Sequence, residues 1–494
     1  MKKNIIFVMA DQFRYDGISG HDNDLVSTPT FDQWISEGVD FSNCYSASPT
    51  CIPARASLLS GLSQVNTGIV GYDEDANWNF PHQLGEEFSK RGYYTKAIGK
   101  MHVNNPRKRM GFDHVELHDG YLHKRRNINS TYSTSYDQVD DYYHWLKNNL
   151  ANAADIIDSG LDCNSRQARE FPYEEKYHPT NWVVDRSIDF LRTRDKNEPF
   201  FLYMSFVRPH SPYDPPSSYF NQYYDILKGY KREDLDLWSK ELGLDKKVSR
   251  VDALTGSISD IDYRRMLAGY LGSINHIDHQ LNKFMIKAEE YQLLDNTIFV
   301  FTSDHGDQLG DHNLFRKGFA YQASIHIPLI IYDPSHRLIG HNKGKVIENL
   351  IELRDLLPSL VDLGTGDKVD GVDGRSVKKL LDNPGTKWRT YLHGEHVLGE
   401  FSNQFIIKLP YKYIWYSQTG LEQLFNLEDD PKEKNDLASR EDHKKILDQL
   451  RDMLIEEIKD REEGFVKNNR LIPGVEQKPL LRINNKYKEN YEEK

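Results

Sequence analysis

Four clusters of chemically active side chains each follow an apolar run of strand length. The runs span residues 4–10, 93–98, 200–207 and 297–302. The clusters after them are, in order, Asp11-Gln12, Gly99-Lys100-Met101-His102, Arg208-Pro209-His210 and Ser303-Asp304-His305-Gly306. Ligands of open α/β sheets bind beyond the carboxyl ends of the strands. We therefore expect these four clusters to form one shared site.

Two of the clusters carry the ligand types of a metal site, namely Asp11 with Gln12 and Asp304 with His305. Carboxylate and amide oxygens suit a hard cation such as Ca²⁺, and an imidazole can join them at the periphery. The plainer alternatives are a strand-end cap for Asp11 and a turn at Asp304-His305-Gly306. The two clusters together favour the metal site over these alternatives.

A further motif, Cys51-Ile52-Pro53-Ala54-Arg55, is typical of a helix amino terminus. A proline is tolerated in the first turn of a helix, so Pro53 places Cys51 at the start of that turn. This end of a helix carries free N–H groups and partial positive charge, which suit an anion, and Arg55 adds a fixed cation. Two other readings of Cys51 are a small buried residue and a thiol nucleophile.

The Cys51 motif, continued to Gly61, resembles the signature of type I (formylglycine-dependent) sulfatases of the alkaline phosphatase superfamily. The resemblance implies that a formylglycine-generating maturation enzyme oxidises Cys51 to an aldehyde. It also implies that Ca²⁺ binds at the site. Gln12 stands where the family more often has Asp, which leaves Mg²⁺ or Mn²⁺ as alternatives. The implied metal ligands are Asp11, Gln12, Cys51, Asp304 and His305.

The same resemblance implies roles for the remaining clusters. Lys100 would bind a sulfate oxygen, and His102 would contact the formylglycine or the substrate. His210 lies in a segment similar to the family's Pro-His-x-Pro-Tyr and would contact the ester oxygen. Lys317 would neutralise the leaving oxygen, with Arg316 as the alternative. Residues 422–437 also resemble the family's closing strand and turn, so the resemblance covers residues 3–460.

The implied reaction is sulfate-ester hydrolysis. A hydroxyl of the hydrated aldehyde attacks sulfur, the alcohol departs with help from His210 or Lys317, and His102 serves as base for the elimination that returns the aldehyde. Arg55, with Lys100 and the metal, supplies the cationic pocket. A phosphonate or phosphate ester hydrolase of the same superfamily is the nearest rival, although those enzymes generally lack the Lys100/His102 pair. A non-catalytic anion-binding protein would keep Cys51 as a thiol.

A small sulfated mono- or oligosaccharide is the expected substrate, with choline sulfate as an alternative. Two basic runs, 107–109 and 124–126, would suit a uronate or a second sulfate. Such runs more often form solvated surface, and we favour that interpretation.

The apolar runs, together with one at 329–332, predict buried parallel strands with helical crossovers at 83–91 and 268–291. After a Gly-rich stretch, runs at 404–409, 411–416 and 422–427 predict a small antiparallel sheet, followed by a helix at 442–460. The predicted fold is therefore α/β, with a large, mostly parallel central sheet flanked by helices. We divide it into a catalytic domain, 1–385, and a C-terminal α+β subdomain, 386–494. Its tail from 468 is either mobile or a draped arm.

Composition limits the classes of molecule that this protein is expected to bind. The 494 residues carry a net charge of -12 at pH 7, which argues against nucleic acid, because phosphate binding needs a basic stripe. No apolar stretch approaches the ~20 residues of a membrane helix. Three cysteines without metal spacing fit a reducing compartment, so we expect a cytoplasmic protein. Homo-oligomerisation stays open.

Overall fold

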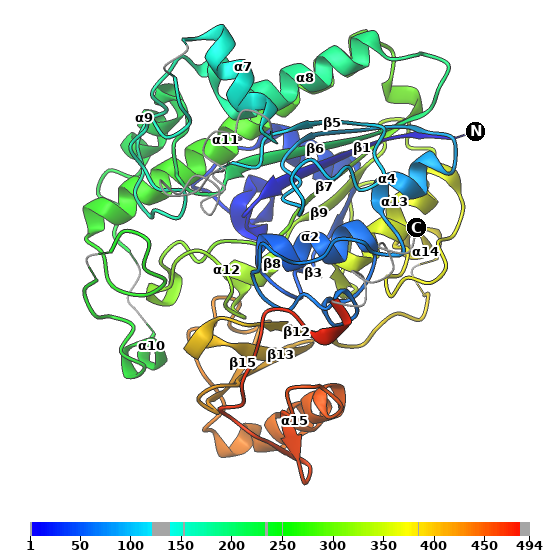
Figure 1. The fold of residues 1–494 in the computed structure, drawn as a ribbon. Helices are drawn as coiled ribbons and strands as arrows, with labels where there is room; N and C mark the ends of the chain where they lie inside the picture. The colour runs from blue at the N-terminus through cyan, green and yellow to red at the C-terminus, as the bar shows by residue number, and fades with distance from the viewer. Residues whose placement is uncertain are drawn as a thin grey trace.

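The computed structural model describes residues 2–120, 139–151, 154–232, 236–248, 250–383 and 385–484. Its centre is an eight-stranded sheet (Figure 1). In spatial order the strands are β10 (Lys345–Ile347), β2 (Val39–Phe41), β9 (Leu329–Tyr332), β7 (Thr297–Ser303), β1 (Asn4–Asp11), β6 (Phe200–Pro209), β4 (Tyr94–Gly99) and β5 (His114–Leu117). The five neighbours from β7 to β5 are parallel, which confirms the predicted α/β fold.

Both faces of this sheet are buried. Successive side chains of a strand point to opposite faces, and in these strands the side chains on both faces are apolar. In β1, Ile5 and Phe7 face one core, whereas Ile6 and Val8 face the other. The helices α2 (Cys51–Ser60), α4 (Leu84–Ser89) and α13 (Leu356–Thr365) cover the first face. The second face lies under α1 (Pro29–Glu37), α8 (Pro179–Thr193), α9 (Ser217–Ile226) and α11 (Asp260–Glu290) (Figure 1).

Two details differ from the sequence prediction. Strand β9 is antiparallel to β7, with Leu329 opposite Thr302. The connection from 304 to 328 contains no crossover helix that would return the chain to the other end of the sheet, so β9 starts where β7 ends. Helix α11 begins at Asp260 rather than 268, because the hydroxyl of Ser259 accepts from the Asp262 N–H and caps it.

The C-terminal sheet has four antiparallel strands in the order β12 (Leu392–His396), β13 (Asn403–Lys408), β14 (Tyr411–Tyr416) and β15 (Glu422–Asn426). One face packs on α15 (Lys444–Ile458), and the other shares a core with residues before 386 such as Tyr45 and Phe319. The predicted antiparallel sheet and helix are therefore present. The boundary at 386 stays a prediction. Strand β12, Leu-His-Gly-Glu-His, lacks the apolar alternation that would have revealed it.

The described part of the tail forms an arm that returns to the larger sheet's side of the molecule (red in Figure 1). The short strands β16 (Val466–Lys467) and β17 (Arg470–Leu471) pair with each other where the tail begins. Further on, Val70 donates its N–H to the carbonyl of Pro479 at 2.9 Å, and Leu481 donates to that of Gly68 at 2.8 Å. Across the described ranges, no helix combines the length and apolarity needed to cross a membrane.

Candidate active site

The four predicted clusters lie at the carboxyl ends of four adjacent strands, β7, β1, β6 and β4. Asp11 is the last residue of β1, Lys100 follows β4, His210 follows β6 and Asp304 follows β7. Because these strands are parallel neighbours, their ends meet at one edge of the sheet. The arrangement follows the prediction of one shared site.

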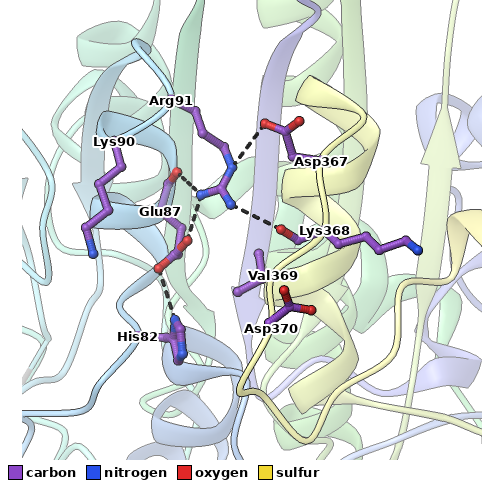
Figure 2. A pocket seen from close by; sticks show the side chains of 8 residues that line it. All are labelled: His82, Glu87, Lys90, Arg91, Asp367, Lys368, Val369 and Asp370. Atoms are coloured by element: carbon purple, nitrogen blue, oxygen red, sulfur yellow. Dashed lines mark hydrogen bonds and ion pairs between the residues drawn. The ribbon is translucent and has the colours of Figure 1, made fainter.

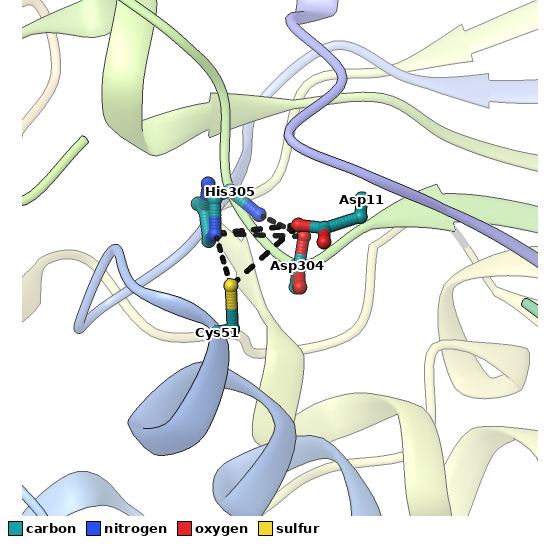
Figure 3. Close-up of side chains that lie close together, drawn as sticks. All are labelled: Asp11, Cys51, Asp304 and His305. Atoms are coloured by element: carbon teal, nitrogen blue, oxygen red, sulfur yellow. Dashed lines mark hydrogen bonds and ion pairs between the residues drawn. The ribbon is translucent and has the colours of Figure 1, made fainter. Parts of the chain in front are cut away.

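A compact group of possible metal ligands sits at this edge (Figure 3). The ligand atoms of Asp11, Cys51, Asp304 and His305 all lie within 4.8 Å of one another, and all four residues are buried. The Sγ atom of Cys51 is 3.3 Å from Nε2 of His305 and 3.7 Å from Oδ1 of Asp11. Nδ1 of His305 donates to the carbonyl of Gly306 at 2.9 Å, so the lone pair of the neutral imidazole is on Nε2, which faces the group. This donor set fits a divalent cation.

Gln12, the neighbour of Asp11, has its side chain held at both ends. Its Oε1 accepts from Nζ of Lys317 at 2.6 Å, and its Nε2 donates to Asp307. Its backbone has a φ of 68°, fixed by its N–H donating to Oδ1 of Asp304 at 3.1 Å and by its carbonyl accepting from the Tyr270 hydroxyl at 2.9 Å. The role of Gln12 as a metal ligand stays a prediction.

Cys51 is the first residue of α2, as the position of Pro53 predicts, and Thr50 is the extended N-cap residue. Four residues on, Arg55 is fully buried, with Nε donating to Asp304 at 2.9 Å. One of its terminal nitrogens donates to the carbonyl of Lys100 at 2.7 Å. Nη2 is buried and has no partner among the described residues, so it can donate to a bound anion.

Lys100 links the nucleophile position to the metal-ligand group. Its Nζ donates to Asp11 and lies 3.5 Å from the Cys51 Sγ. Burial raises the pKa of the Cys51 thiol, but the cations Lys100 and Lys317 and the neighbouring His305 lower it more, so the pKa falls well below its ordinary value. The site thus stabilises negative charge at position 51.

Lys317 and His210 contact each other within the site. Nζ of Lys317 lies 2.5 Å from Nε2 of His210, whose Nδ1 donates to the carbonyl of Ser211 at 2.6 Å. A carbonyl only accepts, so Nδ1 carries the proton and Nε2 accepts from Lys317. Burial and the Lys317 ammonium lower the pKa of His210 to about 4, which keeps it neutral. Arg316, the alternative cation, donates instead to the carbonyl of Asp252 at 2.8 Å.

His102 completes the set of predicted residues. Its N–H donates to Asp119 at 2.8 Å, and Nε2 lies 3.5 Å from the hydroxyl of Tyr72. His102 is also among the neighbours that lower the pKa of the Cys51 thiol. The structure thus brings together Cys51, Arg55, Lys100, His102, His210 and Lys317.

The sequence analysis assigned no role to Asp307, Tyr213, Tyr72 and Glu74. Asp307 carries a weak signal, because it lies three residues after Asp304 in the same loop. It accepts from the hydroxyl of Tyr213 at 2.6 Å as well as from Gln12. Tyr72 and Glu74 lie in a loop without any motif, and only the folded structure places them beside His102.

The first basic run, 107–109, does not join the site as free cations. Arg107 pairs with Asp141 at 2.9 Å, Lys108 donates to Asn79, and Arg109 donates to the carbonyl of Asp113 at 2.9 Å. The second run, 124–126, lies outside the described residues.

A separate hollow of about 500 Å³ lies near the amino ends of β1 and β4 (Figure 2). Its lining is polar, and Arg91, Glu87, Asp367 and His82 are paired with one another. Arg91 contacts Glu87 at 2.6 Å and Asp367 at 3.4 Å, and His82 contacts Glu87 at 3.0 Å. Among the described residues, His, Cys, Asp and Glu side chains form a group with metal-ligand spacing only at the site in Figure 3, not at this hollow.

Comparisons with known proteins agree with this geometry. The sulfatase family model matches residues 3–366, and a model described as N-sulphoglucosamine sulphohydrolase, C-terminal, matches residues 310–460. An arylsulfatase of Clostridium perfringens is 46% identical over 488 residues, which cover 98% of this chain and 100% of that protein. An N-acetylglucosamine-6-O-sulfatase of Bacteroides thetaiotaomicron is 24% identical, over 92% of this chain and 86% of that protein.

Among solved structures, a phosphonate monoester hydrolase of Agrobacterium radiobacter superposes with a TM-score of 0.72 at 21% identity, covering 92% of this chain and 95% of that one. At this identity the likeness shows the fold alone. The family model, however, spans more than half of the chain, and the Clostridium relative matches it nearly end to end. The chain therefore belongs to the sulfatase family of the alkaline phosphatase superfamily and is a sulfuric ester hydrolase.

Proposed function

We propose that this enzyme removes sulfate from a small sulfated alcohol, using Cys51 after its oxidation to formylglycine and a bound divalent cation. The observation that carries this proposal is the position of Cys51. It begins a helix, lies among the metal ligands and is contacted by the Lys100 ammonium. A buried thiol with only a structural role would need none of these neighbours.

The oxidised and hydrated side chain would supply the attacking hydroxyl, and the cation would supply charge for its activation. Asp11, Cys51, Asp304 and His305 would hold the cation, with Ca²⁺ first and Mg²⁺ or Mn²⁺ as alternatives. Gln12 would join them through the second lone pair of its Oε1, which also accepts from Lys317.

The side chains around Cys51 supply the rest of the chemistry. Lys100 and Nη2 of Arg55 would donate to sulfate oxygens, since both are buried cations next to position 51. Lys317 would donate to the departing ester oxygen, and neutral His210 orients it by accepting from its Nζ. His102, beside Cys51, would take the hydroxyl proton during elimination.

A sulfated mono- or oligosaccharide is the substrate class we favour. The sugar is supported by the N-acetylglucosamine-6-O-sulfatase among the relatives. The sulfate is supported by Lys100, which contacts Cys51 and Asp11 and would suit a sulfate oxygen. A choline-sulfatase of Rhizobium meliloti, 25% identical, and the phosphonate monoester hydrolases keep choline sulfate and phosphonate esters as alternatives.

The proposal includes a formylglycine-generating enzyme as a maturation partner and a location in the cytoplasm. The location is supported by the cysteines, because all three are buried and none forms a disulfide with another.

The test combines peptide mass at Cys51 with turnover of 4-nitrophenyl sulfate and of a 4-nitrophenyl phosphonate ester. Preparations with different degrees of oxidation should show sulfatase activity in proportion to the aldehyde fraction. Cys51→Ala should be inactive in every host. Normal sulfatase activity of a fully thiol-bearing preparation, or faster phosphonate than sulfate turnover, would contradict the proposal.

A further inference from the structure

A small hollow opens at the start of α2 and is lined in part by His102, which also belongs to the active site. Its volume is about 20 Å³, enough for one oxygen atom with its hydrogens. Ile52, the neighbour of Cys51 in the chain, forms part of its wall. The other lining residues are Glu74, Trp78, His102, Val103, Asn104 and Asp119.

Two buried polar atoms of this hollow have no partner among the described residues, Oε2 of Glu74 and Nδ1 of His102. A buried carboxylate oxygen without a donor costs free energy, so it is normally satisfied by water or by a ligand. The other oxygen of Glu74 already accepts from the Tyr72 hydroxyl at 3.1 Å. The carboxylate is therefore oriented, and its second oxygen is available for a donor.

The wall that carries Glu74 is fixed by the C-terminal arm. The side chain of Asn484 donates to the carbonyl of Thr67 at 2.9 Å and to that of Asn77 at 3.1 Å, and it accepts from the Asn77 N–H at 2.9 Å. A Cβ at Gly71 would lie 2.9 Å from Pro479, so the two segments are in close contact. The loop from 67 to 78 is thus held from both ends, which is typical of a preorganised binding surface.

The entrance to this region is aromatic. Tyr72 is 44% exposed, and its ring lies edge-on to that of His102, with 6.0 Å between the centroids. An exposed ring next to an oriented carboxylate offers an apolar face and a hydrogen-bond acceptor to the same ligand. Because Ile52, the neighbour of Cys51, and His102 line the same hollow as Glu74, the alcohol part of a substrate whose sulfate lies at Cys51 would extend toward it.

We propose that this hollow is a subsite for a hydrogen-bond donor, a hydroxyl or a protonated amine, on the alcohol part of the substrate. Glu74 accepts from that group, and the donor displaces a water from the hollow. A second sulfate or a carboxylate at this position would meet Glu74 and Asp119 and is disfavoured. The inference rests on the proposed sulfatase function and narrows its substrate class to hydroxylated or amino alcohols, such as sugar sulfates.

The experiment uses fully oxidised enzyme and two substrates, glucosamine 6-sulfate, which carries donors, and 4-nitrophenyl sulfate, which carries none. Glu74→Gln removes the charge and keeps the shape. We expect the ratio of kcat/KM for the sugar to that for the aryl ester to fall at least tenfold, mainly through KM. Asp75→Asn, which removes the same charge from an exposed neighbour, is the matched control and should leave the ratio unchanged.

The outcomes separate the two proposals. A wild-type enzyme that hydrolyses neither ester contradicts the sulfatase proposal. Wild-type activity on the aryl ester alone overturns the subsite, as does an unchanged ratio in Glu74→Gln or an equal fall in Asp75→Asn. Unfolding midpoints of both variants within a few degrees of wild type would show that the ratio reports recognition rather than loss of fold.

Discussion

The side-chain amide of Gln12 donates to Asp307, and this contact decides which way the amide faces. Asp307 is a carboxylate with only acceptors to offer, and it also accepts from the Tyr213 hydroxyl at 2.6 Å. The amide oxygen must therefore point the other way, toward Lys317. Lys317 in turn contacts His210. Asp307, a buried residue outside the predicted site, therefore orients Gln12 and, through Gln12, Lys317.

Asp307→Asn should disturb this arrangement. The new amide presents donors to Gln12 or Tyr213, so Gln12 should turn and place its NH₂ toward Lys317. We expect kcat for 4-nitrophenyl sulfate to fall by roughly 10²-fold with little change in KM, as for a lost transition-state donor. The matched control is Asp311→Asn in the same loop, a half-exposed carboxylate that pairs with Arg14 at 2.8 Å. Equal losses in both variants would refute the orienting role.

Lys100→Ala should remove a donor to the sulfate oxygens. Because Lys100 is buried between Asp11 and Cys51, water cannot replace its ammonium easily. We expect a loss of order 10² in kcat/KM. Lys96→Ala is the control, since Lys96 lies on β4, the strand that Lys100 follows, and pairs with Glu116 at 2.6 Å. Unchanged kinetics for the Lys100 variant would show that this lysine takes no part in the reaction.

Removal of the cation should lower the unfolding midpoint. Asp11 and Asp304 are fully buried and close together, so a bound cation stabilises the folded state by mass action, by about 2.7 kcal/mol at 100 times its Kd. The midpoint should fall on chelation and return with the native metal, and Ca²⁺, Mg²⁺ and Mn²⁺ added separately identify it. In Asp304→Ala the midpoint should not respond to any of them. A wild-type midpoint insensitive to chelation and to all three ions would contradict the metal site.

Much of this site follows from local sequence. An apolar run followed by a polar cluster is a local pattern, so Asp11, Lys100, His210 and Asp304 were placed at one sheet edge without a structure. Pro53 likewise fixed the start of α2. The direction of β9 did not follow, because a strand's composition is the same whichever way it runs.

Residues whose role depends on distant contacts also escaped prediction. The orientation of Gln12 comes from Asp307, 295 positions away in the chain. The loop that carries Glu74 is held by Asn484, which is 407 positions from Asn77. Neither contact leaves a periodic or spaced signal, since each joins two segments that only the fold brings together.

The last prediction concerns stability at low pH. His178 is fully buried at the start of α8, where its Nδ1 accepts from the Thr180 N–H at 3.2 Å. Burial, and then the neighbouring His276, lower its pKa well below 6.5. Below pH 6.5 the unfolded chain therefore takes up a proton at this residue that the folded protein does not. The free energy of unfolding must fall as the pH falls, by up to about 1.4 kcal/mol per pH unit for this group.

His178→Asn keeps a side-chain acceptor at the N-cap and removes the titration. At pH 8, where the imidazole is neutral in both states, the variant should be less stable by a constant amount, because its smaller side chain packs less well against Phe171 and His276. Between pH 6.5 and 4.5 its loss of stability should be shallower than that of the wild type by about 1.4 kcal/mol per unit. Urea unfolding at several pH values measures both curves. Parallel curves across this range would mean that His178 is protonated equally in the folded and unfolded states, contrary to its buried position.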